Sequence, residues 1–448
     1  MIAMYRFTEE ADLQAFEAFV QTHGGQYLQS AKWAQVKEAW GHRFYSGFDG
    51  EERVLTALVL TRTIPGAGNL WYCPAGPVCD YANAALLEQF SAFVTGEMKK
   101  HGGFALFLDP CVPLRINGEK QAEGVTVHKN LLGAGFALNP NVTKYVYKSP
   151  VQMLIPLRDG AGNPVTAQAL LKSFEKGVRY SVRVGESRGL TEKVYTIDDV
   201  ERDPQILEDF AAIMGDTSDR NSFTGRNTDY VKSLMQVFGP QGMDLMLVYY
   251  DKNADRALEE ERQKRRAALE ASLPTAPEKK QRGIREEMDA IDKQHEHFAE
   301  RIRETEGMGD RVAVAGGVTS NYGGIRSCLF GGARNILRNN LRASHFFNFR
   351  RLCRTIDLGC HCHDLGYVLL QDVPPDSDGT LGPCVPEPDF VGIEAFKRSF
   401  GADRVEFIGE YVLIANRVKY YSYTHVIVMA RKVLAAVHGL TRKLRNRK

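Results

Sequence analysis

The sequence predicts a mixed α/β (α+β) protein made of two α/β units, with a helical hairpin inserted in the second unit. Strand-like apolar runs alternate with amphipathic helical segments along most of the 448 residues, which is the pattern of an α/β chain. Apolar residues make up 44% of the sequence, enough for more than one hydrophobic core at this length. Between residues 252 and 309 charges dominate and aromatic residues nearly vanish, which marks the insertion.

The first unit, predicted over residues 1–149, contains a short helix over 29–37. Ser30 is a candidate N-cap for this helix, and Lys37 follows Trp33 by one turn. The unit is expected to continue with strands over 53–61 and 69–73, a Pro/Gly loop over 74–77, a helix over 84–100 and a buried strand over 104–108.

Asp109 directly follows the buried strand over 104–108. An acidic residue in that place lies where ligands commonly bind in α/β sheets. The Asp109-Pro110 pair is equally typical of a simple turn, so the residues alone leave both interpretations open.

A second unit is predicted over residues 150–411, and it carries two candidate basic stripes. One lies on a helix expected over 166–183, where cations recur at spacings of four, three and four residues. The other lies on a helix expected over 333–354. A solvated helix face is the default interpretation, and contact with a phosphate backbone is the alternative. The candidate RNA-binding residues are Lys172, Lys176, Arg179, Arg183, Arg334 and Arg338, and Arg342 continues the second stripe.

A polar, glycine-containing loop over 220–230 leads into another predicted helix of the second unit. Arg226 and Tyr230 are four residues apart, so their side chains are expected to project together from its first turn. The planar fork of an arginine binds phosphate well.

The insertion over 252–309 is predicted to be an antiparallel coiled-coil arm. In its second half two series recur every seven residues and together form an a/d seam with one polar member, His295. The series are Ile284, Ile291, Phe298 and Met288, His295, Ile302. Strands are expected over 244–250 and 311–318, on both sides of the segment. The arm therefore leaves the second unit and returns to it.

Residues 392–401 carry a candidate functional lysine. Ile393, Phe396 and Phe400 recur at helical spacing, which places Lys397 at the edge of a packed face. The residues alone do not separate Lys397 from an ordinary helix lysine.

Four potential metal ligands, Cys360 to His363, are adjacent in the sequence. Structural zinc motifs usually separate paired ligands by two or more residues, and alternate residues of a strand point to opposite faces. A strand with small buried thiols is favoured over zinc. The eight scattered cysteines are typical of reduced thiols, not of a disulfide framework.

Composition and missing motifs exclude several classes of function. The net charge is only +2, so any polyanion site must come from a local cluster. Phosphate-binding loops of the Walker type, dinucleotide fingerprints and serine-hydrolase elbows do not occur. A signal peptide and an apolar run of membrane-span length are not evident either. We therefore expect a cytoplasmic protein.

The order of these features resembles the Fem-type peptidyltransferases (FemABX), and the resemblance covers nearly the whole chain. Each motif is short, but they occur in the family's order, with an arm at the corresponding place. The motifs are Gln29-Ser30 with Trp33 and Lys37, Gly76-Pro77-Val78, Leu108-Asp109-Pro110, Arg179–Gly189, Arg226 with Tyr230, Ala315-Gly316-Gly317, Asp364-Leu365-Gly366, and Phe396-Lys397 through Glu410.

The resemblance implies two GNAT-like domains, with residues 412–448 returning to the first. It also implies an aminoacyltransferase of peptidoglycan synthesis, which contributes to cell wall biogenesis and cell shape. The donor would be aminoacyl-tRNA, and the acceptor a side-chain amine in the stem peptide of lipid II or UDP-MurNAc-pentapeptide. No cofactor and no metal are expected. The basic residues 431–448 suggest peripheral contact with the inner face of the membrane, or a solvated end.

The resemblance also implies site residues. Lys37 and Arg226 would hold phosphates of the precursor, while Tyr230 and Phe396 would line the substrate site. Lys397 and Asp109 would act in catalysis, Lys397 where the tRNA ester meets the amine. Two other classes remain open, an acyl-CoA-dependent GNAT acyltransferase and a non-enzymatic RNA- or membrane-binding scaffold.

Overall fold

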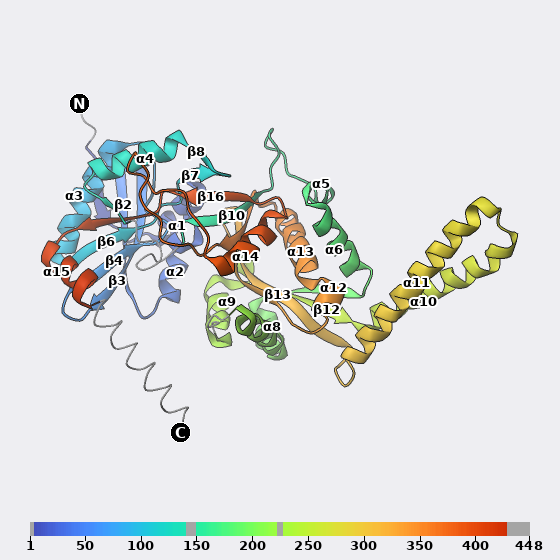
Figure 1. Cartoon of the computed structure of the whole chain (residues 1–448). Helices are drawn as coiled ribbons and strands as arrows, with labels where there is room; N and C mark the ends of the chain where they lie inside the picture. The colour runs from blue at the N-terminus through green and yellow to red at the C-terminus, as the bar shows by residue number, and fades with distance from the viewer. Residues whose placement is uncertain (1–3, 140–148, 222–226, 428–448) are drawn as a thin grey trace, which may run out of the picture. The chain divides into compact units, whose positions relative to one another are not determined.

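The structure, a computed structural model, describes residues 4–139, 149–221 and 227–427, and it divides into two compact units (Figure 1). The first unit contains residues up to Met153, Tyr367–Glu394 and the chain from Asp403 onward. The second contains Leu154–Gly366 and Ala395–Ala402. The domain limits given above, 1–149 and 150–411 with the insert 252–309, stay a prediction.

The first unit is built on an eight-stranded sheet with the order β1-β2-β3-β4-β6-β17-β9, in which β5 also pairs with β3. Its strands are β1 Arg6–Glu9, β2 Gly41–Asp49, β3 Glu52–Ile64, β4 Gly68–Cys73, β5 Val78–Cys79, β6 Gly103–Leu108, β9 Ala137–Asn139 and β17 Glu410–Ile414. Strands β4 and β6 run parallel, and β6 is buried along its whole length. Asp109 therefore directly follows a strand that is buried in the core along its whole length.

Helices and a small second ladder complete the first unit. The helical elements are α1 Leu13–Thr22, η1 Tyr27–Gln29, α2 Ala31–Val36, α3 Ala84–Lys100, α4 Ala122–Gly133, α15 Arg417–Tyr421 and η3 Ser422–Ile427. The ladder joins β16 Asp403–Phe407, β7 Pro113–Ile116 and β8 Glu119–Lys120. Strand β17 pairs with both β6 and β9, so a late segment of the chain forms an interior strand of the first sheet, next to the edge strand β9.

The second unit contains a sheet in which β11, β12, β13, β14 and β15 follow one another. Its strands are β11 Leu190–Tyr195, β12 Met243–Asp251, β13 Arg311–Tyr322, β14 Ile325–Ala333 and β15 Cys362–Tyr367, and β10 Val151–Pro156 lies where the units join in the chain. Its helices are α5 Ala167–Ser173, α6 Lys176–Glu186, α7 Ile197–Arg202, α8 Gln205–Asn221, α9 Thr228–Gly242, α12 Arg338–Leu341 and α13 Ala343–Asp357. Helix α14, Pro388–Arg398, ends in this unit. Val248, Val314 and Phe346 belong to the core between sheet and helices.

The inserted arm is formed by α10, Lys252–Ser272, and α11, Glu278–Glu304, joined by η2, Leu273–Thr275. The two helices lie side by side in Figure 1 and connect β12 to β13. Asp255, near the start of α10, pairs with Arg301, near the end of α11. Arg266, further along α10, pairs with Asp292, which lies earlier in α11. The arm is therefore an antiparallel hairpin.

Two helices expected from the sequence are wrong in extent. The segment expected to be one helix over 166–183 is α5 and α6, separated at Phe174, whose ψ of 156° is extended. Phe174 is 1% exposed and packs edge-on against Phe349 and Phe400, so tertiary burial breaks the helix there.

The helix expected over 333–354 begins much later. Strand β14 continues to Ala333, because Gly331 and Gly332 pair with β13, and the helical region starts as the four-residue α12. Arg334 and Arg338 consequently do not share a helix face. Among the described residues, no helix is long and apolar enough to cross a membrane. The basic segment 431–448 lies outside them.

Candidate functional site

Gln29 fastens the loop after β4 in the first unit. Its Nε2 donates hydrogen bonds to the carbonyls of Pro74 (2.6 Å) and Leu58 (3.3 Å), and its Oε1 accepts from the Leu58 amide at 2.9 Å. A Cβ on Gly76 would lie 2.5 Å from Gln29 Cδ. Glycine at 76 therefore lets the loop lie directly on this side chain.

Asp109, which follows β6, also holds the loop over 74–77. The carboxyl is buried, with 7% of the residue exposed; Oδ2 accepts a hydrogen bond from the Tyr72 hydroxyl at 2.7 Å, and Oδ1 accepts from the Ala75 amide. Ala75 has a φ of 52°, in the left-handed region. Three sequence motifs, around Gln29, Gly76 and Asp109, thus form one hydrogen-bonded structure.

Lys37 lies at the C-terminal end of α2. Ser30 is the N-cap of this helix, as expected, and its side chain accepts a hydrogen bond from the Trp33 amide at 3.1 Å. The Lys37 ammonium lies 4.5 Å from the centroid of the buried Trp33 ring. This cation–π contact directs the lysine side chain along the helix.

Lys397 lies in the last turn of α14, half-buried, beside Gly366 of β15. A Cβ on Gly366 would lie 3.6 Å from Lys397 Nζ and 3.6 Å from the carbonyl oxygen of Cys328. Gly366 has a φ of +87°, and its amide donates to Asp364 Oδ1 at 2.7 Å. Two distant motifs therefore meet at one point of the second unit.

Aromatic packing fixes the helix end that carries Lys397. The Phe396 and Phe400 rings lie 5.1 and 6.0 Å from His345, and Phe400 lies 5.2 Å from Phe174. Burial, with the nearby Arg342 charge, lowers the pKa of His345 to about 4. The imidazole is therefore neutral at pH 7 and packs as an aromatic ring.

Tyr230 belongs to the first turn of α9. Asn227 caps that helix and accepts a hydrogen bond from the Tyr230 amide at 3.0 Å. The Tyr230 ring lies edge-on to Phe330 of β14, at 6.4 Å, and Cys328 of the same strand adjoins Gly366. Tyr230 and Lys397 thus lie beside one strand. Arg226 falls outside the described residues.

The candidate RNA-binding cations differ in their surroundings. Lys172, Lys176 and Arg183 are exposed. Arg179 donates to the carbonyls of Phe174 and Lys172, and Arg334 pairs with Asp216 at 2.9 Å. The sixth, Arg338, lines a cavity of about 430 Å³ at the base of the hairpin. Lys37 and Asp109 belong to the first unit, and Lys397, Tyr230, Phe396 and these cations to the second.

In the Cys360–His363 segment, Cys360 and His363 are buried, Cys362 is half-buried and His361 is exposed. His363 is fully buried, with Nδ1 2.8 Å from Thr355 Oγ1, and burial lowers its pKa well below the usual value. The described ranges contain no group of three or more His, Cys, Asp or Glu residues arranged to hold a metal ion.

Sequence reasoning gave no individual role to three residues of these sites: Tyr72, Gly366 and Tyr180. Gly366 and Tyr72 were visible only as members of longer runs. Tyr180 carries no local signal, and Arg342 was predicted only as part of a basic helix stripe; the cavity that both line is assembled from segments far apart in the chain.

Comparison with known proteins gives a consistent result. The model of the FemAB family matches residues 12–427. A lipid II:glycine glycyltransferase of Staphylococcus saprophyticus is 26% identical over 445 residues, covering 96% of this chain and 98% of its own. The lipid II:glycine glycyltransferase of Staphylococcus aureus is 25% identical, with 91% and 92% covered. The crystal structure of FemX superposes with a TM-score of 0.73 at 22% identity, covering 94% of this chain and 99% of FemX. The predicted fold class, α/β with two GNAT-like domains, is confirmed.

Proposed function

The chain belongs to the FemAB family, and we propose that it moves an amino acid from aminoacyl-tRNA to a stem-peptide amine of a peptidoglycan precursor. It is an aminoacyltransferase, like its relatives. The acceptor would be lipid II or UDP-MurNAc-pentapeptide, and the product an extended interpeptide bridge. The single observation that carries this proposal is the family match across residues 12–427.

The reaction needs no covalent enzyme intermediate, because the aminoacyl ester is already activated. The acceptor amine attacks the ester carbonyl, a C–N amide bond forms, and the C–O bond to the terminal ribose breaks. The amine loses a proton and the ribose hydroxyl gains one. The protein has to align the two reactants, assist this proton movement and stabilise the oxyanion.

Lys397 is our candidate for the oxyanion partner. Its ammonium is held half-buried beside Gly366, and the helix end that carries it is fixed by Phe396 and Phe400. A cation fixed before the reaction stabilises developing negative charge without reorganising during the step.

The remaining roles are proposals of the same kind. Lys37 and Arg226 would bind precursor phosphates, and Tyr230 and Phe396 would line the substrate site. Asp109 is the candidate base. Because both of its oxygens already accept hydrogen bonds from Tyr72 and Ala75, we propose that its first role is to position the 74–77 loop.

The proposed acceptor also bears on where the protein acts. Lipid II is a membrane lipid, so an enzyme using it would work at the inner face of the membrane. The basic residues 431–448 would favour such peripheral contact electrostatically.

The test is a transfer assay with purified full-length protein. Precursor is incubated with tRNA charged with glycine, alanine or serine, and the mass of the precursor is measured. The expected result is a gain of one or more amino-acid residues with charged tRNA, none with deacylated tRNA, and a rate lower by about 10²–10³-fold with Lys397→Ala. Lipid-linked and nucleotide-linked acceptors are assayed separately.

Other outcomes would overturn the proposal in distinct ways. Transfer from acyl-CoA, and not from charged tRNA, would indicate a GNAT acyltransferase. Equal binding of charged and uncharged tRNA, with no product from any amino acid or acceptor, would indicate an RNA-binding scaffold.

A further inference from the structure

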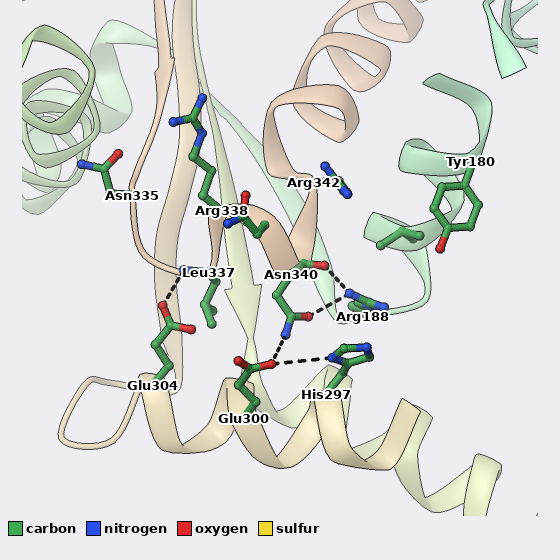
Figure 2. A pocket seen from close by; sticks show the side chains of 12 residues that line it. Tyr180, Arg188, His297, Glu300, Glu304, Asn335, Leu337, Arg338, Asn340 and Arg342 are labelled. Carbon is green, nitrogen blue, oxygen red and sulfur yellow. Dashed lines mark hydrogen bonds and ion pairs between the residues drawn. The ribbon is translucent and has the colours of Figure 1, made fainter. Parts of the chain in front are cut away.

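A cavity of about 430 Å³ lies in the second unit where α6, the base of α11 and the segment around α12 meet (Figure 2). Its volume falls in the range of pockets that enclose small ligands, roughly 300–1,000 Å³. Nothing in the reaction described above uses it. The lining residues that matter here are Tyr180, Arg188, Glu300, Arg338, Asn340 and Arg342.

A hydrogen-bonded row centred on Asn340 forms one wall of this cavity (Figure 2). Asn340 Oδ1 accepts from Arg188 at 2.8 Å and from Arg301 at 3.1 Å, and its Nδ2 donates to Glu300 at 3.1 Å. Arg301 is itself buried and paired with Asp255. The wall is therefore rigid, and it ties the α12 segment to the base of the hairpin.

The backbone beside this wall is strained on both sides of α12. Leu337 and Arg342 have φ values of 55° and 57°, in the left-handed region that non-glycine residues avoid. The Leu337 amide donates to Glu304 at 2.9 Å, and Leu337 and Leu341 are buried. Such strain persists only where the surroundings hold it, and it concentrates at ligand sites. Here it presents Arg338 and Arg342 at the cavity.

These two arginines are the available cations of the cavity. Both are exposed, and within the described ranges neither forms an ion pair with a carboxylate. Glu300 and Glu304 of the lining accept hydrogen bonds from Asn340 and from the Leu337 amide and stay negative. The lining holds three arginines, Arg188, Arg338 and Arg342, against these two acids, so it keeps an excess of positive charge. An anionic ligand would thus meet guanidinium groups that are not neutralised by the protein.

Tyr180 supplies a different kind of surface. It is 62% exposed, unusual for a large aromatic residue, and it lines both this cavity and a neighbouring one of about 280 Å³. The second cavity adds the exposed Arg183. An exposed ring beside unpaired guanidinium groups is the combination that binds single-stranded nucleic acid, by base stacking and phosphate contact.

We propose that this cavity binds an unpaired nucleotide of the donor RNA, with Arg338 and Arg342 on its phosphate and Tyr180 stacked on its base. The proposal rests on the proposed function for the identity of the RNA. In this proposal the donor RNA lies against the base of the hairpin. The hydrogen-bonded wall and the strained α12 segment then hold the bound nucleotide.

RNA binding by the full-length protein tests this site without any transfer reaction. Fluorescence anisotropy with deacylated tRNA and with a short single-stranded RNA measures Kd at several salt concentrations. The double variant Arg338→Gln/Arg342→Asn should weaken both affinities at least about tenfold and reduce the salt slope by about two. Asparagine is chosen at 342 because it tolerates the left-handed backbone.

Matched variants separate stacking and local charge from general effects. Tyr180→Ala should weaken binding of the single-stranded RNA about tenfold. Tyr180→Phe keeps an aromatic ring and should bind this RNA like the wild type. Arg202→Gln removes an exposed arginine of α7, elsewhere in the same unit, and should bind RNA like the wild type. Wild-type affinity in the double variant, or an equal loss in Arg202→Gln, would overturn the assignment.

The kinetic readout distinguishes this proposal from the proposed function. In the transfer assay, the double variant should raise KM for charged tRNA while leaving kcat and KM for the precursor unchanged. Active transfer with unchanged KM would reject only the nucleotide site. Absence of transfer in the wild type would reject the proposed function, while the anisotropy result would still decide whether the cavity binds RNA.

Discussion

Lys397 and Gly366 lie against each other in the second unit, with the ammonium 3.6 Å from the place where a Cβ on the glycine would be. Gly366 ends the Asp364-Leu365-Gly366 motif of β15, and Lys397 lies in the last turn of α14. The two motifs therefore form one site. A positive φ at Gly366 makes glycine the residue best suited to this position.

Replacement of Lys397 should remove transfer without removing precursor binding. In Lys397→Ala the proposed oxyanion partner is lost, and kcat should fall about 10²–10³-fold, the usual effect of removing one such donor. Lys397→Arg keeps the charge and should retain part of the activity. Turnover of charged tRNA and calorimetric binding of precursor measure the two effects. Undiminished kcat in Lys397→Ala would reject the role.

Gly366→Ala should impair both stability and activity. A φ of +87° is unfavourable for alanine by about 1–2 kcal/mol, and the added methyl group would occupy the space beside Lys397 Nζ. Gly359→Ala is the matched control, because Gly359 has a φ of +69° and nothing within 4 Å of its Cβ position. Denaturant unfolding should show a similar loss for both. Only Gly366→Ala should lower kcat, and equal activity in the two variants would show that the space at Gly366 does not matter for the role of Lys397.

The sequence was most informative where periodicity is strong and local. The helix expected over 84–100 is α3, Ala84–Lys100, and the insert is a helical hairpin in which Ile291 of the predicted seam is buried while His295 is exposed. The helices expected over 166–183 and 333–354 were wrong in extent. Burial of Phe174 and the pairing of Gly331 and Gly332 with β13 override the local helical pattern, and neither contact is visible within a short window.

In the candidate site, too, the sequence predicted the local features and not the contacts between distant residues. The sequence placed Asp109 at the end of a buried strand and Lys397 on a helix edge, because each depends on its immediate neighbours. The approach of Gly366 to Lys397, and the bonds from Tyr72 to Asp109, join residues far apart in the chain. Such contacts are set by the sheet topology, which one sequence does not specify.

Asp109 offers a test of positioning against proton transfer. Asp109→Ala leaves the Tyr72 hydroxyl and the Ala75 amide without their buried acceptor, and each should cost about 1–3 kcal/mol. Tyr72→Phe removes only one of these bonds. If Asp109 acts mainly by holding the loop, Tyr72→Phe and Asp109→Asn should lower kcat to a comparable extent. A loss confined to Asp109→Asn would instead assign the base to Asp109.

The base of the hairpin should depend on the buried pair Asp255–Arg301. The two side chains are 0% and 1% exposed, and Asp255 also accepts a hydrogen bond from the Tyr250 hydroxyl at 2.8 Å. Asp255→Ala leaves a buried guanidinium unpaired, which should cost about 3–5 kcal/mol in unfolding free energy. Glu287→Ala breaks the exposed pair with Arg265 on the same hairpin and should leave the free energy of unfolding almost unchanged, because exposed ion pairs contribute little. An equal change in the free energy of unfolding in the two variants would show that the buried pair contributes no more than the exposed pair.

Acidification should destabilise the protein through His345. Burial lowers the pKa of His345 to about 4 in the folded state, against about 6.5 when unfolded. Between these values the unfolded chain binds a proton that the folded chain does not, so the free energy of unfolding falls as pH drops from 6.5 to 4 and is unaffected above 6.5. His345→Leu keeps the apolar packing with Phe396 and Phe400 and removes the titration. Urea unfolding at pH 7.5 and pH 5 should show a smaller difference in the variant, which retains the contribution of buried His363. An identical pH dependence in both proteins would contradict the lowered pKa of the half-buried His345.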